Sequence, residues 1–139
     1  MTLSPDQTEL LVTKAREARE KAIAPYSNYR VGAALLTSAG EIITAGNIES
    51  STYGLTLCAE RVAIFSALSH GHRSFEAIAV ATDNGATPCG ACRQILWEFA
   101  GDIPVYIVDA KDQVTSQQMS EFFPYPFDDS KLAGQGETE

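Results

Sequence analysis

The stretch FEAIAVATDNGATPCGACRQILWEFAGDIPVYIV, residues 75–108, decides the fold class. Its first apolar run, 75–82, predicts a buried strand, and a polar, glycine-containing loop separates this strand from a helix over 88–100 that has proline at its first position. A second apolar run, 103–108, predicts another strand. Two strands joined by a crossover helix favour parallel pairing in an α/β protein.

The rest of the chain predicts a helix, a hairpin and two further helices. Segment 4–24 has a serine cap, a proline at the first helical position and a capping-box glutamine. Apolar runs at 30–37 and 41–46 flank a short turn and predict the hairpin. Residues 57–69 predict a second long helix and 117–123 a short one. The order α-β-β-α-β-α-β predicts a mixed sheet with helices on both faces.

Length and composition favour one domain. The chain has 139 residues, of which 45% are hydrophobic, and this suits a single core over residues 1–133 with a frayed tail at 134–139. No run of eighteen apolar residues occurs, and the N-terminus turns polar at once. We therefore expect neither a membrane span nor a secretory signal, and a cytoplasmic protein with reduced thiols.

The charge bears on the class of partner. Lys and Arg number 10 against 18 Asp and Glu, which gives a net charge of -8. A protein that follows a phosphate backbone needs a concentrated basic surface, so a polynucleotide partner is disfavoured relative to a small, uncharged substrate. We expect neither a nucleic-acid nor a membrane partner.

All three cysteines stand in a metal-ligand pattern. Cys58 is followed further along the chain by Cys89 and Cys92 in a Cys-x-x-Cys pair on one predicted helix. The two histidines, His70 and His72, lie beside a glycine at an expected solvated helix end. Three thiolate ligands would leave one zinc position open for water, as in catalytic sites. A structural zinc or an inert thiol cluster is the alternative.

Two residues beside Cys58 complete the chemistry. Glu60, a carboxylate that is not a ligand, could take a proton from the zinc water and later deliver protons to the ring nitrogen and the leaving ammonia of a nucleobase. Three thiolates and Zn²⁺ sum to -1, so a cation should compensate, with Arg61 favoured and Arg93 a weaker candidate. Cys-x-Glu followed by Pro-Cys-x-x-Cys is typical of zinc nucleobase deaminases.

The chain resembles the small homotetrameric cytidine deaminases that use three cysteine ligands. The resemblance covers nearly the whole chain and rests on four motifs, YSNYRVGAA at 26–34, NIE at 47–49, CAER at 58–61 and PCGACRQ at 88–94. It implies a three-layer α/β/α sandwich with a mixed five-stranded sheet, and one zinc ion per subunit. It also implies that Cys58, Cys89 and Cys92 are the zinc ligands, that Glu60 is the proton shuttle and that Arg61 hydrogen-bonds the thiolates.

The same resemblance implies a set of substrate contacts. Asn47 and Glu49 match the pair that grips a ribose hydroxyl, Tyr29 matches an aromatic residue that packs on the pyrimidine, and Ala59 lies among the substrate-binding positions. In this family the active site is completed across subunits. Phe127, in the pattern FPYPF, is the candidate for entering a neighbour's pocket, and Tyr53 is a second. A homotetramer with shared sites is therefore expected.

Two positions depart from the family pattern. Ser50 stands where an Asn usually follows the Glu of the ribose loop, the loop expected at 47–56, and Ala45 stands where a Gly is common. The leading hypothesis is deamination of cytidine and 2′-deoxycytidine in pyrimidine salvage. Ser50 keeps open a deaminase of a modified cytosine nucleoside such as blasticidin S. The pattern leaves two further function classes open, a polynucleotide deaminase and a non-catalytic, zinc-stapled interaction domain.

Overall fold

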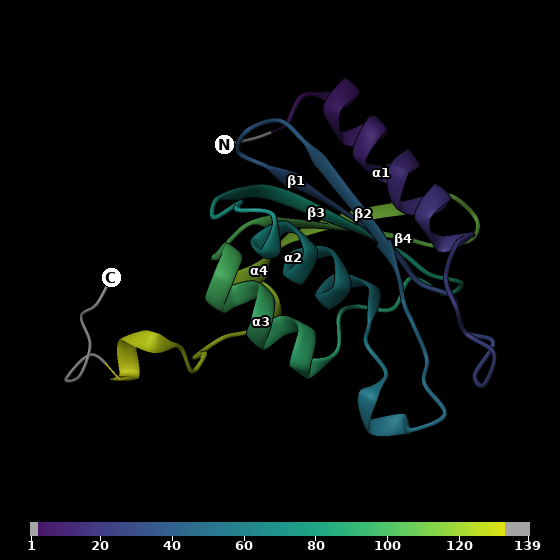
Figure 1. Ribbon diagram of the computed structural model, residues 1–139. Coiled ribbons are helices and arrows are strands. Elements are labelled where there is room, and N and C mark those ends of the chain that lie inside the picture. The colour runs from purple at the N-terminus through teal and green to yellow at the C-terminus, as the bar shows by residue number, and fades with distance from the viewer. Residues whose placement is uncertain (1–2, 133–139) are drawn as a thin grey trace.

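The computed structural model describes residues 3–132, and a five-stranded sheet in the order β2-β1-β3-β4-β5 forms its centre (Figure 1). Only β3 and β4 pair in parallel, and the other neighbours are antiparallel, so the sheet is mixed as expected. The strands are β1 (Gly32–Thr37), β2 (Ile42–Gly46), β3 (Phe75–Ala81), β4 (Pro104–Val108) and β5 (Val114–Gln118).

Helices cover both faces of the sheet, which confirms the three-layer sandwich (Figure 1). One apolar cluster lies between the sheet and α1, and the other lies under α2 and α3 on the opposite face. The helices are α1 (Pro5–Arg19), α2 (Ala59–Ser69), α3 (Gly90–Ala100) and the short α4 (Met119–Phe122), with 3-10 turns at Tyr53–Leu55 and Asp129–Leu132. Within residues 3–132 no helix is long and apolar enough to cross a membrane.

The topology brings the starts of α2 and α3 to one edge of the sheet. Strands β2 and β3 both pair antiparallel with β1, so they run parallel to each other, and β3 runs parallel to β4. Both α2 and α3 are therefore crossovers between parallel strands, and each begins after the carboxyl end of a strand. The first turns of the two helices face the same edge, and α2 packs beside α3.

Helix α1 has the predicted capping box but ends earlier than predicted. Ser4 Oγ accepts from the Gln7 N–H at 3.1 Å, and Gln7 Oε1 accepts from the Ser4 N–H at 2.9 Å. The helix stops at Arg19, because residues 20–24 join the loop at 47–56 instead: the Ile23 N–H donates to the Asn47 carbonyl at 2.8 Å.

Close packing of α1 on β1 explains the small residues of that strand. A Cβ added at Gly32 would lie 2.2 Å from the Ala15 carbonyl oxygen, well inside van der Waals contact. Ala33 and Ala34 are fully buried, on opposite faces of the strand. Only small side chains therefore let helix and strand approach to this distance.

Both long crossover helices begin later than the sequence pattern predicts. Cys58 and Cys89 are N-cap residues in extended conformation, with ψ of 153° and 171°, and Pro88 precedes the α3 cap. Neither cap makes a side-chain hydrogen bond to its helix. The thiols at these positions are thus not used to satisfy the first helical N–H groups.

The fifth strand is expected only from the family resemblance, because its residues show no apolar alternation. All five residues of β5 are exposed at the sheet edge, which is why periodicity does not reveal it. The short helix expected over 117–123 is α4, whose Met119 is fully buried. The predicted frayed tail, 134–139, lies outside the described residues, and the single-domain boundary at 133 stays a prediction.

Candidate metal centre and active site

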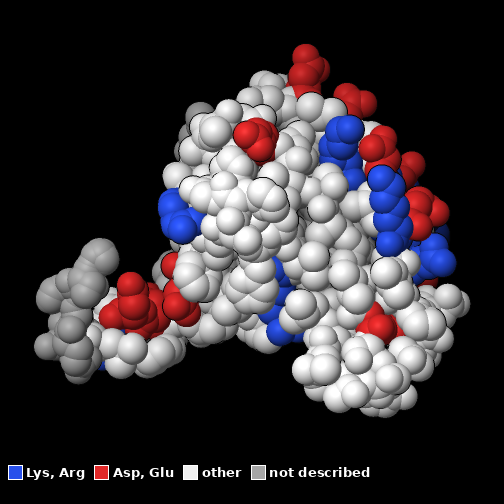
Figure 2. Space-filling view, viewed as in Figure 1, with Lys and Arg blue, Asp and Glu red and all other residues white. Residues whose placement is uncertain are grey.

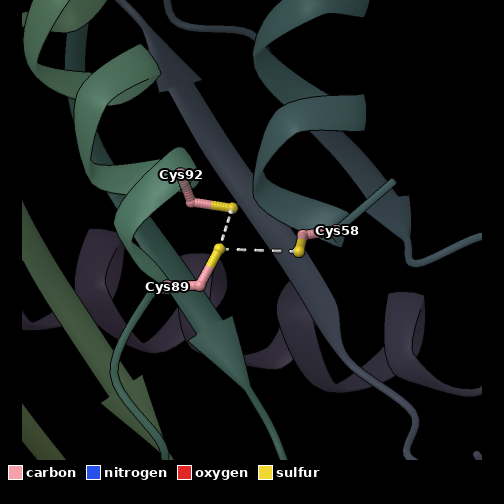
Figure 3. A group of neighbouring side chains, drawn as sticks. All are labelled: Cys58, Cys89 and Cys92. Carbon is pink, nitrogen blue, oxygen red and sulfur yellow. Dashed lines mark hydrogen bonds between the residues drawn. The ribbon is translucent and has the colours of Figure 1, made fainter. Parts of the chain in front are cut away.

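The three cysteine sulfurs meet where α2 and α3 begin (Figure 3). Cys58 comes from the start of α2, and Cys89 and Cys92 come from the first turn of α3. The Sγ atoms of Cys58 and Cys89 are 3.8 Å apart, those of Cys89 and Cys92 are 3.5 Å apart, and all three lie within 4.8 Å of one another.

This spacing fits a zinc ion. Zinc–sulfur bonds of about 2.3 Å in tetrahedral directions separate the sulfurs by about 3.8 Å. The observed 3.5 and 3.8 Å agree with that separation. Exposure grades from Cys92, which is buried, to Cys89, which is exposed, so an ion here would meet solvent on one side. The donor set therefore holds three positions and leaves a fourth open.

The charges around the sulfurs favour a bound cation. A hydrogen bond from Cys92 and a second from Arg61 lower the pKa of Cys58 to about 5. The Nη2 of Arg61 lies 3.4 Å from the Cys58 sulfur. The pKa of Cys92 is raised instead, by its hydrogen bond to Cys58 and by burial. Without a metal, one thiolate is thus stabilised at the expense of its neighbour, and a dication would allow all to ionise.

Glu60 is a buried carboxyl beside this cluster. Its side chain lies in the first turn of α2, and the residue is 5% exposed. The pKa of Glu60 is raised to about 7, chiefly by burial and in part by the negative charge of Cys58, while a backbone hydrogen bond and the charge of Arg61 oppose the shift. A carboxyl with a pKa near neutrality can both accept and release a proton at physiological pH.

Asn47 is held more firmly than a solvated loop residue would be. The residue is 7% exposed, and both ends of its side-chain amide are used. Its Oδ1 accepts from the Val31 N–H at 2.9 Å, and its Nδ2 donates to the Tyr29 carbonyl at 2.9 Å. Asn47 therefore joins the loop at 47–56 to the segment that carries Tyr29, and one amide N–H remains for a ligand.

Glu49 is held by the segment before β1. The N–H groups of Tyr26 and Ser27 donate to its Oε1 at 2.9 and 3.1 Å, and the Ser27 hydroxyl donates to its Oε2. These bonds, led by the Ser27 hydroxyl, lower the pKa of Glu49. The carboxylate lines a hollow of about 350 Å³, which is bordered by Tyr26, Ser27, Glu49, Ser50, Tyr53 and Thr56.

Tyr29 has a role that a phenylalanine at this position would lack, because its hydroxyl makes a hydrogen bond. Its Oη donates to Asn84 Oδ1 at 2.8 Å, in the loop that leads to Cys89. Ala59 is fully buried between Cys58 and Glu60 in sequence. The chain segments that carry the candidate base, sugar and metal contacts are thus tied to one another by hydrogen bonds.

Comparisons with known proteins agree with this geometry. Residues 5–108 match the model of the cytidine and deoxycytidylate deaminase zinc-binding region. A cytidine deaminase of Sporosarcina psychrophila is 44% identical over 128 residues, which cover 90% of this chain and 94% of that protein. The chain belongs to this zinc-binding deaminase family.

Two further relatives of the family bear on fold and substrate. The crystal structure of cytidine deaminase from Burkholderia pseudomallei superposes with a TM-score of 0.83 at 42% identity, covering 86% of this chain and 98% of that one. A blasticidin-S deaminase of Bacillus cereus is 32% identical over 111 residues, covering 73% of this chain and 79% of that protein. The family's three-layer fold and zinc cofactor therefore hold for this chain.

Arg93, the weaker candidate for the compensating cation, does not hydrogen-bond the thiolates. Its guanidinium donates to the Pro88 carbonyl at 2.7 Å, the Phe122 carbonyl at 2.9 Å and Thr87 Oγ1 at 2.9 Å. These three acceptors use the donors of the guanidinium, so the side chain holds the residue that precedes Cys89 and makes no hydrogen bond to a sulfur. Among the arginines, only Arg61 of the deaminase motif contacts a cysteine sulfur within residues 3–132.

Phe127 and Tyr53 are not buried in a single chain of this deaminase. They are 56% and 73% exposed. The Phe127 carbonyl accepts from Gln94 Nε2 at 2.9 Å, and the Trp97 indole donates to Asp128 at 2.9 Å, so α3 holds the base of the C-terminal segment. That segment extends beyond the sheet and helices (Figure 1).

Basic side chains do not form a continuous strip on the face shown in Figure 2, where Lys and Arg (blue) lie interleaved with Asp and Glu (red).

Two residues that hydrogen-bond the candidate site, Ser27 and Asn84, are not singled out by the sequence pattern. Ser27 offers one signal, since a serine two residues before Tyr29 often closes a local turn. Asn84 offers none, because its partner lies 55 residues away.

Proposed function

We propose that this protein catalyses the zinc-dependent hydrolytic deamination of cytidine and 2′-deoxycytidine to the uridines, with release of ammonia, in pyrimidine salvage. The observation that carries the proposal is the cluster of three sulfurs at tetrahedral spacing with the buried Glu60 beside it. The names of the relatives, cytidine deaminases at 44% and 42% identity, support the same substrate.

In this proposal Cys58, Cys89 and Cys92 hold one zinc ion per subunit. Zinc with three protein ligands supplies an open position at which water becomes acidic enough to lose a proton near neutral pH. Arg61 stabilises the ligand set, because its guanidinium approaches the Cys58 sulfur and offsets the excess negative charge of three thiolates.

Glu60 carries the proton transfers. It accepts one proton from the attacking water and donates it to the pyrimidine ring nitrogen, then accepts the second proton of that water, from the hydroxyl now on the amidine carbon, and donates it to the departing amino group. Its pKa of about 7 suits transfer in both directions. Protonating the ring nitrogen makes the amidine carbon more electrophilic, and protonating the amino group lets it leave as ammonia. One carboxyl thus acts first as base and then as acid, which its seclusion from solvent favours.

The other assigned residues hold the nucleoside. Glu49 accepts a hydrogen bond from a sugar hydroxyl, and the free N–H of the Asn47 amide donates a hydrogen bond to the same hydroxyl. Tyr29 packs on the pyrimidine, and Ala59 borders the base between Cys58 and Glu60. Support for these roles comes from the hollow beside Glu49 and from the hydrogen bonds that fix Asn47 and Tyr29.

Replacement of the proton shuttle tests the reaction. We expect Glu60→Gln to keep zinc and fold but to lose turnover of cytidine by about a thousandfold, because general acid–base catalysis contributes on this scale. Ammonia release and the change in ultraviolet absorbance measure turnover, and elemental analysis measures zinc. Substantial activity in a zinc-replete Glu60→Gln protein would overturn the mechanism.

The quaternary part of the proposal is a cytoplasmic homotetramer whose sites are shared between subunits. Phe127 and Tyr53 would complete a neighbour's pocket, and their exposure in one chain supports this. Sedimentation with activity measured across a dilution series tests it. We expect activity to fall as the oligomer dissociates, and a fully active monomer would contradict the shared site.

A second candidate substrate is a modified cytosine nucleoside such as blasticidin S. The similarity to a blasticidin-S deaminase favours it, together with Ser50 in the ribose loop. Ser50 is occupied within its own loop, where its N–H donates to Thr56 Oγ1 at 3.0 Å and its Oγ accepts from the Thr52 N–H at 3.0 Å. Parallel assays of cytidine and blasticidin S distinguish the two substrates.

A further inference from the structure

The carboxylate of Glu49 is anchored through both of its oxygens. Oε1 accepts from the backbone N–H groups of Tyr26 and Ser27, and Oε2 accepts from the Ser27 hydroxyl. The two partners lie 23 and 22 residues before Glu49, in the segment between α1 and β1. A side chain on one loop is therefore fixed by donors from another.

The Ser27 hydroxyl has a defined direction. Its oxygen accepts from the Tyr29 N–H at 3.0 Å while its proton points to Glu49. The residue between them, Asn28, has a left-handed φ of 57°, which folds the backbone tightly enough for this turn to close. Because the oxygen is held from behind, the proton has a fixed acceptor in the Glu49 carboxylate.

We propose that Ser27 is a positioning residue for sugar recognition, which holds the Glu49 carboxylate in the orientation that accepts a hydroxyl of the nucleoside sugar. Ser27 and Glu49 line the same hollow of about 350 Å³, so the held carboxylate borders space for a ligand. The inference rests on the proposed function, in which Glu49 contacts the sugar.

The Ser27 hydroxyl restrains the second oxygen of the Glu49 carboxylate, which the backbone donors do not contact. Two N–H groups hold Oε1 alone, so coupled rotations about the side-chain torsions, of which the terminal one is broad for Glu, still allow Oε2 to tilt. The hydroxyl on Oε2 removes that freedom. A carboxylate has about four acceptor sites and three are used here, so capacity for a sugar O–H remains. The lowered pKa of Glu49 keeps the carboxylate ionised and accepting.

A substrate comparison tests the role of Ser27. For Ser27→Ala we expect the KM for cytidine to rise about tenfold with kcat within about twofold, because an interaction made equally in the ground and transition states affects binding alone. On 2′,3′-dideoxycytidine, which lacks both ring hydroxyls, the variant and the parent protein should differ by less than about twofold. Ser27→Thr keeps the hydroxyl at an exposed position and should restore the KM.

Ser38→Ala is the matched control. Ser38 Oγ also donates to a glutamate, Glu76 Oε2, at 2.7 Å, but it follows β1 at the end of the strand away from the ribose loop, so KM should not change. An equal loss on cytidine and the dideoxy substrate would overturn the proposal, since Ser27 would then act through Tyr29 and the base. A Ser27→Thr protein with the KM of Ser27→Ala would also overturn it. Parent protein that fails to deaminate cytidine would refute the proposed function instead.

Discussion

The metal centre and the loop at 47–56 lie at the same edge of the sheet but are built differently. The sulfurs are presented by the first turns of two helices, whose backbones set the direction of Cys58, Cys89 and Cys92. Asn47 and Glu49 lie on an irregular segment and are held by hydrogen bonds to residues 26–31. Secondary structure orients the first region, and side-chain contacts orient the second.

The difference teaches how each region should respond to mutation. A helix start needs only the ligand type at the right spacing, and the three-residue separation of Cys89 and Cys92 places both on one face. The loop depends on polar partners that must all be present, because an unpaired buried group costs about 1–3 kcal/mol. Substitution of a cysteine should therefore strongly weaken binding of the ion, whereas substitutions in the loop should weaken stability and substrate affinity separately.

The largest effect should follow removal of a buried ligand. For Cys92→Ala we expect zinc affinity to fall by about a thousandfold, on the order of 4 kcal/mol, because one of three protein ligands is lost. Competition with a chelator measures the affinity. Ile95→Val, which trims the same helix without touching a sulfur, should keep the zinc. A Cys92→Ala protein that retains parental zinc affinity would break the assignment of the centre.

The next effect concerns Glu60 in metal-free protein. Its folded pKa of about 7 lies above the ordinary value of 4.5 for a glutamate, so between these pH values the folded state binds more protons than the unfolded state. Unfolding free energy should consequently fall as pH rises through this range, by up to about 3 kcal/mol relative to Glu60→Gln. Denaturant titrations of both chelator-treated proteins from pH 4.5 to 7.5 measure the difference. If the free energies of unfolding of the two proteins changed in parallel with pH, burial would not raise the pKa of Glu60.

A smaller effect should follow loss of the loop's buried amide. Asn47→Ala leaves the Val31 N–H and the Tyr29 carbonyl without their side-chain partner, and we expect the free energy of unfolding to fall by about 2 kcal/mol. Denaturant unfolding of the zinc-loaded protein measures it. Asn47→Asp keeps the acceptor but loses the donor, so its free energy of unfolding should lie between those of the parent protein and Asn47→Ala.

The zinc content of Asn47→Ala tests whether the loop and the metal centre are independent. Asn47→Ala should bind zinc as the parent protein does, because the Asn47 side chain hydrogen-bonds Tyr29 and Val31 in the segment before β1 and not a cysteine. If this variant lost zinc as Cys92→Ala is expected to, the two regions would not be independent, and the comparison between them would fail.

Much of the fold is predictable, and the exceptions have physical causes. The α1 capping box and the strands around β3 follow from local patterns, which confirms those predictions. The pattern places the end of α1 too late, because the bridge from Ile23 to Asn47 competes with helix continuation. Strand β5 is invisible to periodicity, since an exposed edge strand needs no apolar face. In the site, Arg61 is the arginine that contacts a sulfur, as favoured, and the weaker candidate Arg93 is used by other acceptors, which include Phe122, 29 residues away.

Local spacing in the chain is enough to predict the three zinc ligands and the carboxyl beside them, because Cys-x-Glu and Cys-x-x-Cys each lie within about one helical turn. Only the tertiary structure decided that these two turns meet, since Cys58 and Cys89 are 31 residues apart and converge through two crossovers between parallel strands. The tertiary structure also decided the setting of Glu49, whose partner Ser27 comes from another loop. Local geometry follows from spacing, whereas contacts between distant segments depend on how the sheet and helices pack.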